Sequence, residues 1–503
     1  MYWPTDCLHN LPILGTHYPP KGGILLSIQF TNVLSDNIKV LQELFSLDNT
    51  FVVRRVQSTG GLSCAVFFFD GMVNNTAINE SVIRPLVHAP QGQMTAQAVA
   101  ESILQINDCK VVPDLDAMLS ALLYGDTVVL VDGDDCPIVV NTKGFALRSP
   151  SEPDNEKVLR GPREGFTESF MTNLSMLRRR VNDPRLTCSF ARYAGKTNTV
   201  VCVCWLKGVT PPALVYEMQR RIQKISLDGI LDANYVSECV RDAPGSPFPT
   251  LGTTERPDVA VSRLLEGRVI VLTDGSPVAL SAPCILQECF QANDDYYIAV
   301  RQAVVSRALR VAGFALSIII PALYVALLSF HQELLPTRLL LAIAAAQKGV
   351  PLPVFWEILL LLLVFETLKE AGTRTPSVMG STMSIVGGLV LGQAAVSARF
   401  LSAPAVIIVA VAAVTGLTVP KLQSAALVLR FSLLAASTVA GLYGLIFGLA
   451  LMIAHLCTLR SFDTPYLLNL IPRVHPETAD TWLRSPWRDM PRRRFLAHSE
   501  DDV

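Results

Sequence analysis

A run of about 20 uncharged and mostly apolar residues, Val311 to Phe330, constrains this chain more than any other feature. A helix of that length rises about 30 Å, which matches the hydrocarbon core of a bilayer. Similar stretches follow at Val354 to Leu368, Ser381 to Ala398, Ala403 to Val419 and Phe431 to Ala454. The second half of the chain is therefore predicted to be an α-helical polytopic membrane domain of about five to six helices.

The first 300 residues have the regular Asp, Glu, Lys and Arg of a globular protein. The N-terminus has no basic region followed by an uninterrupted apolar one, so no cleaved secretory signal is expected. Arg301, Arg307 and Arg310 precede the first span, and the positive-inside rule then predicts a cytoplasmic, soluble N-terminal half.

Five positions recur at a constant offset of 142 residues (264 − 122), which indicates an internal duplication. Each copy reads as a helix end, a Gly stop, a β-branched run and an Asp-Gly turn, the pattern of a hairpin after a helix. The recurring residues are Leu122, Gly125, Leu130, Asp132 and Gly133, then Leu264, Gly267, Leu272, Asp274 and Gly275.

The duplication predicts an α/β soluble N-terminal half made of two similar small mixed-sheet subdomains, followed by the membrane domain. The expected boundaries are an N-terminal segment 1–35, subdomain 1 at 36–150, a linker helix within 151–185, subdomain 2 at 186–297, the membrane domain at 298–460 and a basic C-terminal tail at 461–503.

Composition and motifs argue against several function classes. The net charge of −1 disfavours a nucleic-acid binder, and eleven scattered cysteines lack the paired spacing of a zinc site. Cys202 and Cys204 share one strand face, where core packing is favoured over metal binding. Nucleotide-binding glycine loops, a GxSxG elbow and an HExxH motif are absent from the sequence. No cofactor, no metal and no enzymatic activity are expected.

Five charged residues lie in or beside one predicted span: Glu357, Glu366, Lys369, Glu370 and Arg374. Glu357, Glu366, Glu370 and Arg374 are singled out among them. Ionised groups in lipid are costly, so they normally face a bundle interior, a partner or a water-filled path, and these are the candidate pore or gating residues. The alternative is that Glu366 to Arg374 is the charged interfacial end of the helix, with Glu370 paired to Arg374. Glu357 then reaches the opposite interface.

Glycines in the apolar half indicate close helix packing. Gly387, Gly388 and Gly392 lie in or beside one span, and Gly388 with Gly392 forms GxxxG. The later glycines at 441, 444 and 448 extend the pattern, which favours a tightly packed bundle or a homo-oligomer.

The number of crossings decides on which side the tail lies. Leu334 to Ala346 is short and contains Pro336 and Arg338, so it is either a re-entrant or in-plane helix or a sixth crossing. Five spans place the tail opposite the soluble half, and six place both on one side. The five arginines from Arg484 to Arg494 favour a cytoplasmic tail and so six crossings.

Several motifs lie in order along residues 40 to 490: Arg160–Ser169, Asn173–Arg180, Phe248–Asp258, Leu264–Arg268, Asp274–Pro277, Asp294–Tyr297, Phe365–Arg374, Val386–Gln393 and Asp480–Pro486. Together they resemble the GerA spore germination family, and specifically its A subunits. The residues that carry the motifs of the soluble half are Arg160, Gly161, Pro162, Gly165, Phe166, Glu168, Asn173, Thr254, Glu255, Arg256, Pro257, Asp258, Asp295 and Tyr296.

The resemblance implies a subunit of a nutrient germinant receptor in the spore inner membrane or cell membrane. It implies a permease-like B subunit and a lipoprotein C subunit as partners, and oligomers that form a gated ion channel. Two alternatives remain: an accessory germination channel of the SpoVAF type, and a solute transporter, which should show inverted repeats among its spans.

The motifs of the soluble half allow two interpretations. A helix carrying Arg160 to Arg180 either binds an anion or an adjacent subunit, or makes salt bridges with Glu164 and Glu168, which is favoured because surface charges are usually solvated. Asp258 and Glu255 are expected to cap the following helix, and Arg256 to pair with a carboxylate.

Overall fold

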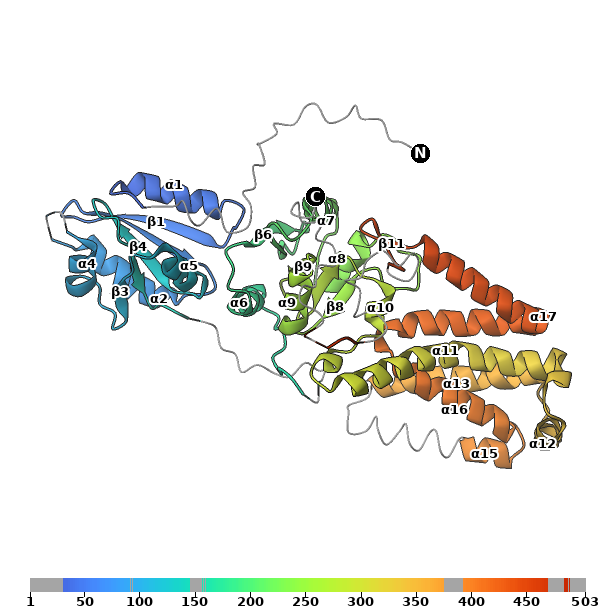
Figure 1. Cartoon of the computed structure of the whole chain (residues 1–503). Coiled ribbons are helices and arrows are strands. Elements are labelled where there is room, and N and C mark those ends of the chain that lie inside the picture. The colour runs from blue at the N-terminus through green and yellow to red at the C-terminus, as the bar shows by residue number, and fades with distance from the viewer. Residues whose placement is uncertain are drawn as a thin grey trace, which may run out of the picture.

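The protein is described by a computed structural model that places residues 30–90, 92, 94–144, 156, 158, 160–374, 392–468, 484–486 and 488. Two α/β subdomains and a helical bundle follow one another along an elongated molecule (Figure 1). We call residues 30–297 the head and the helices from residue 300 to 458 the bundle.

Subdomain 1 is a five-stranded sheet in the order β1-β2-β4-β5-β3, with helices packed on it. Apolar side chains fill both faces: one layer includes Val66 and Val129, the other Phe67 and Leu130. Its elements are α1 (Leu34–Leu44), β1 (Phe51–Gln57), β2 (Ser63–Phe69), α2 (Asn75–Ala77), η2 (Ile78–Ile83), α3 (Arg84–Val87), α4 (Ala96–Ser102), β3 (Cys109–Val111), α5 (Leu115–Leu123), β4 (Thr127–Val131) and β5 (Ile138–Val140).

Subdomain 2 repeats that order as β6-β7-β9-β10-β8. Its elements are α6 (Phe170–Arg180), β6 (Leu186–Tyr193), β7 (Thr199–Leu206), α7 (Pro212–Gln223), α8 (Ala233–Val240), β8 (Gly252–Thr254), α9 (Pro257–Leu265), β9 (Val269–Thr273), β10 (Ala279–Ala282), α10 (Leu286–Cys289) and η3 (Asn293–Tyr296). The two similar α/β subdomains are confirmed. Every strand pairing described in the two sheets is antiparallel, so the expectation of mixed sheets needs correction.

The duplication extends to the helix that precedes each sheet. In subdomain 1, the Asn37 side chain accepts the Thr31 N–H at 2.8 Å, and Asp132 Oδ1 accepts the N–H of Leu34 at 3.1 Å. In subdomain 2, Asn173 accepts the Thr167 N–H at 2.7 Å, and Asp274 accepts the N–H of Phe170 at 3.3 Å. Helix α6 was expected as a linker; it packs as the first helix of subdomain 2.

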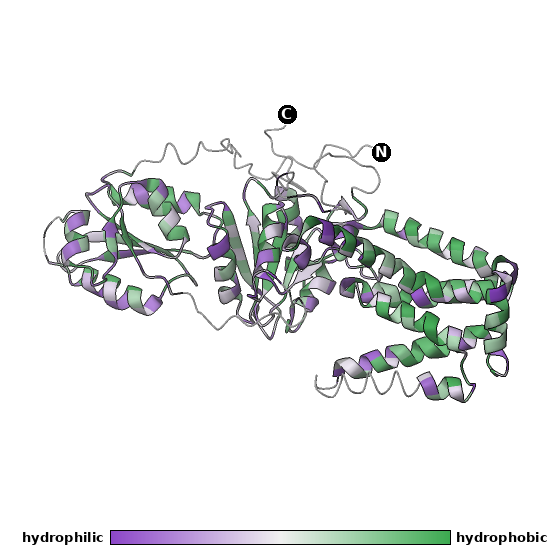
Figure 2. Ribbon diagram, turned by 60° about the horizontal axis from the view of Figure 1, so that its bottom comes forward, coloured by the Kyte–Doolittle hydropathy of each residue, from purple (hydrophilic) through white to green (hydrophobic). Residues whose placement is uncertain are grey.

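The bundle consists of helices that run along one another, with a short helix across its far end (Figure 1). Apolar residues dominate the bundle, whereas the head alternates apolar and polar residues (Figure 2). The elements are α11 (Val300–Phe330), η4 (Gln332–Leu334), α12 (Thr337–Gln347), α13 (Val354–Arg374), α15 (Gly392–Ser397), α16 (Ala403–Gly416), η6 (Pro420–Leu422) and α17 (Gln423–Thr458). Val300–Phe330 and Pro420–Thr458 are long and apolar enough to cross a membrane, by length and composition alone.

Helix α17 is a hairpin, and the expected single span Phe431 to Ala454 is wrong. The helix breaks at Ala440 and Gly441, where Gly441 has φ +59° and ψ −135°, a conformation that L-residues rarely adopt. The arms 423–439 and 442–458 lie against each other so closely that a Cβ on Gly444 would fall 2.0 Å from the carbonyl oxygen of Ala436. Each arm has about 17 residues, a length of ~25 Å at 1.5 Å per residue.

The chain after the hairpin returns to the head. Ser461 Oγ accepts the N–H of Cys284 at 3.0 Å and donates to the carbonyl of Thr250 at 2.6 Å. Leu286 donates its N–H to the carbonyl of Tyr466 at 3.1 Å, and the Tyr466 side chain is fully buried. The short pair β11 (Arg460–Ser461) and β12 (Thr464–Pro465) therefore anchors the end of the bundle to subdomain 2.

Candidate functional sites at the head–bundle junction and inside the bundle

The motif residues of the head come together beside the start of the bundle. The Glu156 carboxylate accepts hydrogen bonds from Thr254 Oγ1 at 2.6 Å and from the Glu255 N–H at 3.1 Å. Lys421, in the turn between α16 and α17, lies 3.7 Å from the same carboxylate. Glu156 thus connects β8 and α9 to the bundle.

Arg256 is the centre of this cluster and is completely buried. Its guanidinium donates to both oxygens of Asp258, at 3.1 and 2.9 Å, and to the carbonyl of Pro162 at 2.6 Å. Arg256 therefore pairs with a carboxylate, as expected. Helix α9 receives no side-chain cap, so the expected caps from Asp258 and Glu255 are wrong; Asp258 lies in the first turn, and Pro257 is the first helical residue.

The segment 160–169 is not helical, contrary to expectation, because Gly161, Pro162 and Gly165 disfavour a helix. Gly161 has φ +116°, and a Cβ there would lie 2.7 Å from the ring of Tyr297. Phe166 is buried and donates its N–H to the carbonyl of Glu255 at 2.7 Å. The segment acts as a strap that holds α9 against the residues leading into α11.

The arginines of α6 form the salt bridges that the sequence favoured. Glu164 pairs with Arg179, and with Arg180 at 2.6 Å. Partial burial raises the pKa of the Glu164 carboxyl, but the hydrogen bonds from the two arginines outweigh burial and hold that pKa below its usual range. The carbonyl of Glu168 accepts the N–H of Gly275 at 2.7 Å, and Arg160 is exposed.

Asp295 fixes the first turns of α11 to the head. The buried carboxylate accepts from Arg307 Nε at 3.0 Å and from Arg310 Nη2 at 2.7 Å. Burial raises the pKa of Asp295, but the hydrogen bonds and charges of Arg310 and Arg307 outweigh burial and hold it below its usual value. The Tyr296 ring packs against the guanidinium groups of Arg307 and Arg484, at 5.5 and 6.0 Å from its centroid.

A cavity of about 110 Å³ lies at this junction. Its walls come from α9, from η3 and from the turn before α17, and they include Asp258, Ser262, Arg263, Tyr296, Tyr297 and Lys421. Tyr297 Oη donates to Asp258 at 2.6 Å across it, and burial together with this bond raises the pKa of Tyr297 to about 12. Head and bundle thus share one polar, densely bonded junction.

Inside the bundle, Glu366 forms an ion pair that the sequence analysis did not foresee. Arg430 Nη1 donates to Glu366 Oε1 at 3.0 Å, and Lys369 Nζ lies 2.6 Å from the other carboxylate oxygen. Arg430 is only 3% exposed. The last span was expected to begin at residue 431, one residue after Arg430, although the charge of Arg430 amid Ala425 to Phe431 was a usable signal.

The other candidate gating residues lie apart from that pair. Glu357 is buried, and its carboxylate accepts the N–H of Ser402, the residue that caps α16. Glu370 and Arg374 are exposed and pair with each other at 2.6 Å, as the interfacial alternative expected. Glu366 therefore pairs with a basic side chain of another helix, Arg430 of α17, whereas Glu357 accepts a backbone N–H at the start of α16.

The predicted packing glycines divide into three groups. Gly387 and Gly388 lie outside the described residues. Around Gly392, at the start of α15, no atom among the described residues lies within 4 Å of where a Cβ would be, so its predicted close packing is not found there. The hairpin glycines do pack closely: a Cβ at Gly448 would lie 2.7 Å from Leu433.

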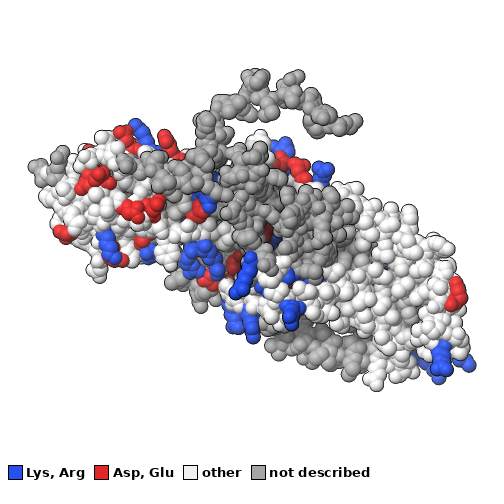
Figure 3. Space-filling model, in the orientation of Figure 1, with Lys and Arg blue, Asp and Glu red and all other residues white. Residues whose placement is uncertain are grey.

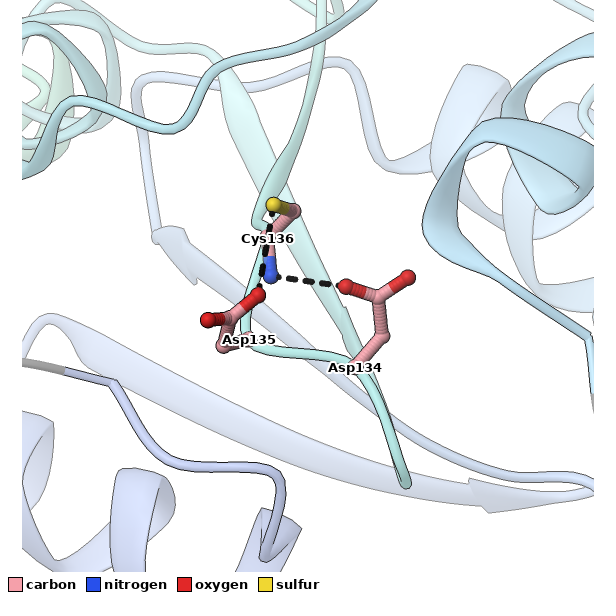
Figure 4. A group of neighbouring side chains, drawn as sticks. All are labelled: Asp134, Asp135 and Cys136. Carbon is pink, nitrogen blue, oxygen red and sulfur yellow. Dashed lines mark hydrogen bonds between the residues drawn. The ribbon is translucent and has the colours of Figure 1, made fainter.

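Asp134, Asp135 and Cys136 form a small cluster in the turn after β4 (Figure 4). Asp134 accepts the N–H of Ala96 at 2.7 Å and that of Cys136 at 3.0 Å, and the Cys136 thiol donates to Asp135 at 3.4 Å. These bonds tie the turn to the start of α4. They explain the cluster as a structural one.

Comparison with known proteins identifies the family of this chain. A profile described as Bacillus/Clostridium GerA spore germination protein matches residues 39–495. Spore germination protein KA of Bacillus subtilis (strain 168) is 38% identical over 476 residues, covering 93% of this chain and 88% of its own length. The uncharacterized membrane protein YfkQ of the same organism is 34% identical over 463 residues, covering 92% and 90%.

A solved structure also matches this chain. It is the crystal structure of the N-terminal domain of the A subunit of the Bacillus megaterium spore germinant receptor GerK3, with 27% sequence identity and a TM-score of 0.39. The match covers 52% of this chain and 98% of that one. By the match along nearly its whole length and the identity to its relatives, this chain belongs to the GerA family of spore germination proteins.

Proposed function

We propose that the chain is a non-enzymatic, membrane-embedded subunit of a germinant receptor complex, which couples nutrient sensing to ion release by forming a gated channel with further copies of itself. A permease-like subunit and a lipoprotein subunit are its proposed partners. The observation that carries the proposal is the Glu366–Lys369–Arg430 cluster inside an otherwise apolar bundle. Ionisable groups in such surroundings typically mark ion pathways or gates.

The surface of the bundle supports placement in a bilayer. Between the head and the far end of the molecule, the bundle surface is almost free of charge in this view (Figure 3). Large apolar side chains point outward, with Val439 82% exposed and Tyr443 77% exposed. Exposed apolar surface of this extent fits lipid or neighbouring subunits rather than water.

The arrangement of the helices supports a topology with both ends on one side. Helices α13 and α16 run antiparallel to α11. Glu366, late in α13, lies near Ser317 of α11 through Arg430. Glu357, early in α13, lies beside Ser402 at the start of α16 and beside Tyr324, which is later in α11 than Ser317. The two arms of α17 add one crossing outward and one back. The hairpin thus adds one crossing to the spans expected from the sequence, whereas α12 lies across the far end (Figure 1).

Reconstitution tests the proposal directly. Liposomes that contain this chain and its two partner subunits should release cations when the nutrient is added. Glu366→Gln should change that release, whereas Glu333→Gln, an exposed carboxylate at 72% exposure, should leave it unchanged. Unchanged flux with Gln at Glu357, Glu366 and Glu370 together would remove these carboxylates from the mechanism.

A further inference from the structure

Helix α11 contains a proline in the middle of the bundle. Pro321 has no backbone N–H, so the carbonyl of Ser317, four residues earlier, loses the donor that a regular helix would supply. Ser317 is fully buried. A buried carbonyl without a donor is unfavourable, and native proteins normally satisfy such a group from elsewhere.

Arg430 supplies the missing donor. Its Nε donates to the Ser317 carbonyl at 3.0 Å, while Nη1 of the same guanidinium donates to Glu366 at 3.0 Å. A Cβ on Gly416 of α16 would lie 3.1 Å from its Nη2. One side chain of α17 therefore touches α11 at the proline break, α13 through the carboxylate and α16 through a glycine.

We propose that Arg430 is a positioning residue that fixes the geometry of α11 at Pro321 by linking the Ser317 carbonyl to Glu366, so that this point of the helix serves as the hinge of the gate. The gating role of this hinge rests on the proposed channel function. The linkage among the three residues is independent of that function.

The chemistry of the three groups suits a hinge with a defined setting. A proline break is a common site of helix bending, because the backbone there is not held by a helical hydrogen bond. The planar guanidinium has separate donors that serve two acceptors at once, which a lysine ammonium cannot reproduce in the same geometry. A buried ion pair often adds little net stability relative to apolar side chains, so the proposed role of this pair is to fix one arrangement of the helices.

A mutant cycle tests the linkage on full-length protein in detergent, with the thermal unfolding midpoint as the readout. All variants carry Glu366→Gln, so that no unpaired carboxylate contributes. Arg430→Gln should lower the midpoint when residue 321 is proline. In the Pro321→Ala background, Arg430→Gln should lower the midpoint by less than half as much, because the alanine N–H donates to the Ser317 carbonyl. Equal losses in both backgrounds would overturn the linkage.

A milder substitution gives a functional readout that loss of folding would not produce. At matched amounts of protein, Arg430→Lys should shift the nutrient concentration for half-maximal ion release by about tenfold, the effect of one lost hydrogen bond. Adding Pro321→Ala should return it most of the way. A shift that Pro321→Ala leaves untouched would contradict the hinge.

The two experiments separate the hinge from the channel. If the cycle is non-additive but the reconstituted complex conducts no ions, the linkage stands and the proposed function fails. If ions flow and the cycle is additive, the channel stands and the hinge fails.

Discussion

Arg178 and Asp48 form a buried ion pair across the boundary between the two subdomains, and both side chains are 2% exposed. Arg178 also donates to Thr50 Oγ1 at 2.7 Å and stacks over the Phe69 ring, 4.3 Å from its centroid. Beside it, the N–H of Asn49 donates to the carbonyl of Cys188 in β6 at 3.1 Å. The subdomains are therefore joined through a desolvated charge and not only through the connecting chain.

Removing this arginine should strongly destabilise the head. Arg178→Met leaves the Asp48 carboxylate buried without its counter-ion, which typically costs about 3–5 kcal/mol. Arg185→Met is a matched control, because Arg185 also pairs with an aspartate, Asp183, but is 50% exposed, where pairs contribute about 0–1 kcal/mol. Denaturant unfolding of the full-length protein in detergent measures both. Equal effects would show that the buried pair is unimportant.

A side chain at Gly161 should disturb the junction between head and bundle. Gly161→Ala would place its Cβ 2.7 Å from the Tyr297 ring and also strain a backbone with φ +116°, so a loss of about 1–3 kcal/mol is expected. Gly61→Ala is the control, since Gly61 has φ +89° but open space around its Cβ position. Thermal unfolding should show a larger loss for Gly161→Ala. An equal loss of stability in Gly161→Ala and Gly61→Ala would mean that backbone strain alone causes it and that contact with the Tyr297 ring does not contribute.

The hairpin should depend on Gly444. Gly444→Ala places a methyl group 2.0 Å from the Ala436 carbonyl oxygen, which no rotamer change relieves because the nearest atom belongs to the backbone. The arms must separate, and the yield of folded protein in detergent and its thermal midpoint should both fall. Gly392→Ala, with open space at its Cβ position, should change neither. A tolerated Gly444→Ala would contradict the hairpin.

The junction at Asp295 should weaken in acid. The folded-state pKa of this carboxyl lies below its unfolded value of roughly 3.9, so its contribution is complete above that value and is lost as pH falls through the folded pKa. The difference in thermal midpoint between the wild type and Asp295→Asn should therefore be constant near neutral pH. It should shrink once the pH falls below about 4. A difference that does not vary over this range would contradict the ion pairs with Arg307 and Arg310.

The head was largely predictable because its signals are local. Glycine stops at Gly125 and Gly267 and Asp-Gly turns after β4 and β9 specify a helix end followed by a hairpin, wherever the neighbouring segments lie. The role of α6 was missed because it depends on bonds to Asp274, about 100 residues away in the chain. Spacing within α6 contains no trace of that contact.

The bundle was less predictable, because an apolar sequence predicts burial in lipid but does not predict where the helix turns back. Gly441 lies in an uninterrupted apolar run, and glycine is common in straight membrane helices, so its positive φ left no signal. The charge of Arg430 was visible in the sequence, but its contact with α11 beside Pro321 depends on how α17 packs. In the junction, Arg256 was expected to pair with a carboxylate. Its complete burial was not predicted, because it depends on the extended strap at 160–169, which was expected to be helical.

The anchoring of Ser461 and Tyr466 on subdomain 2 has a consequence for biosynthesis. Ser461 is 177 residues beyond Cys284, its hydrogen-bond partner. At translation rates of about 5–20 residues per second, that patch of the nascent head stays uncovered for roughly 10–35 seconds while the apolar helices are made. Truncated chains therefore leave this patch of subdomain 2 exposed, whereas complete chains cover it. Quality-control proteases can distinguish truncated from complete chains by this exposed patch.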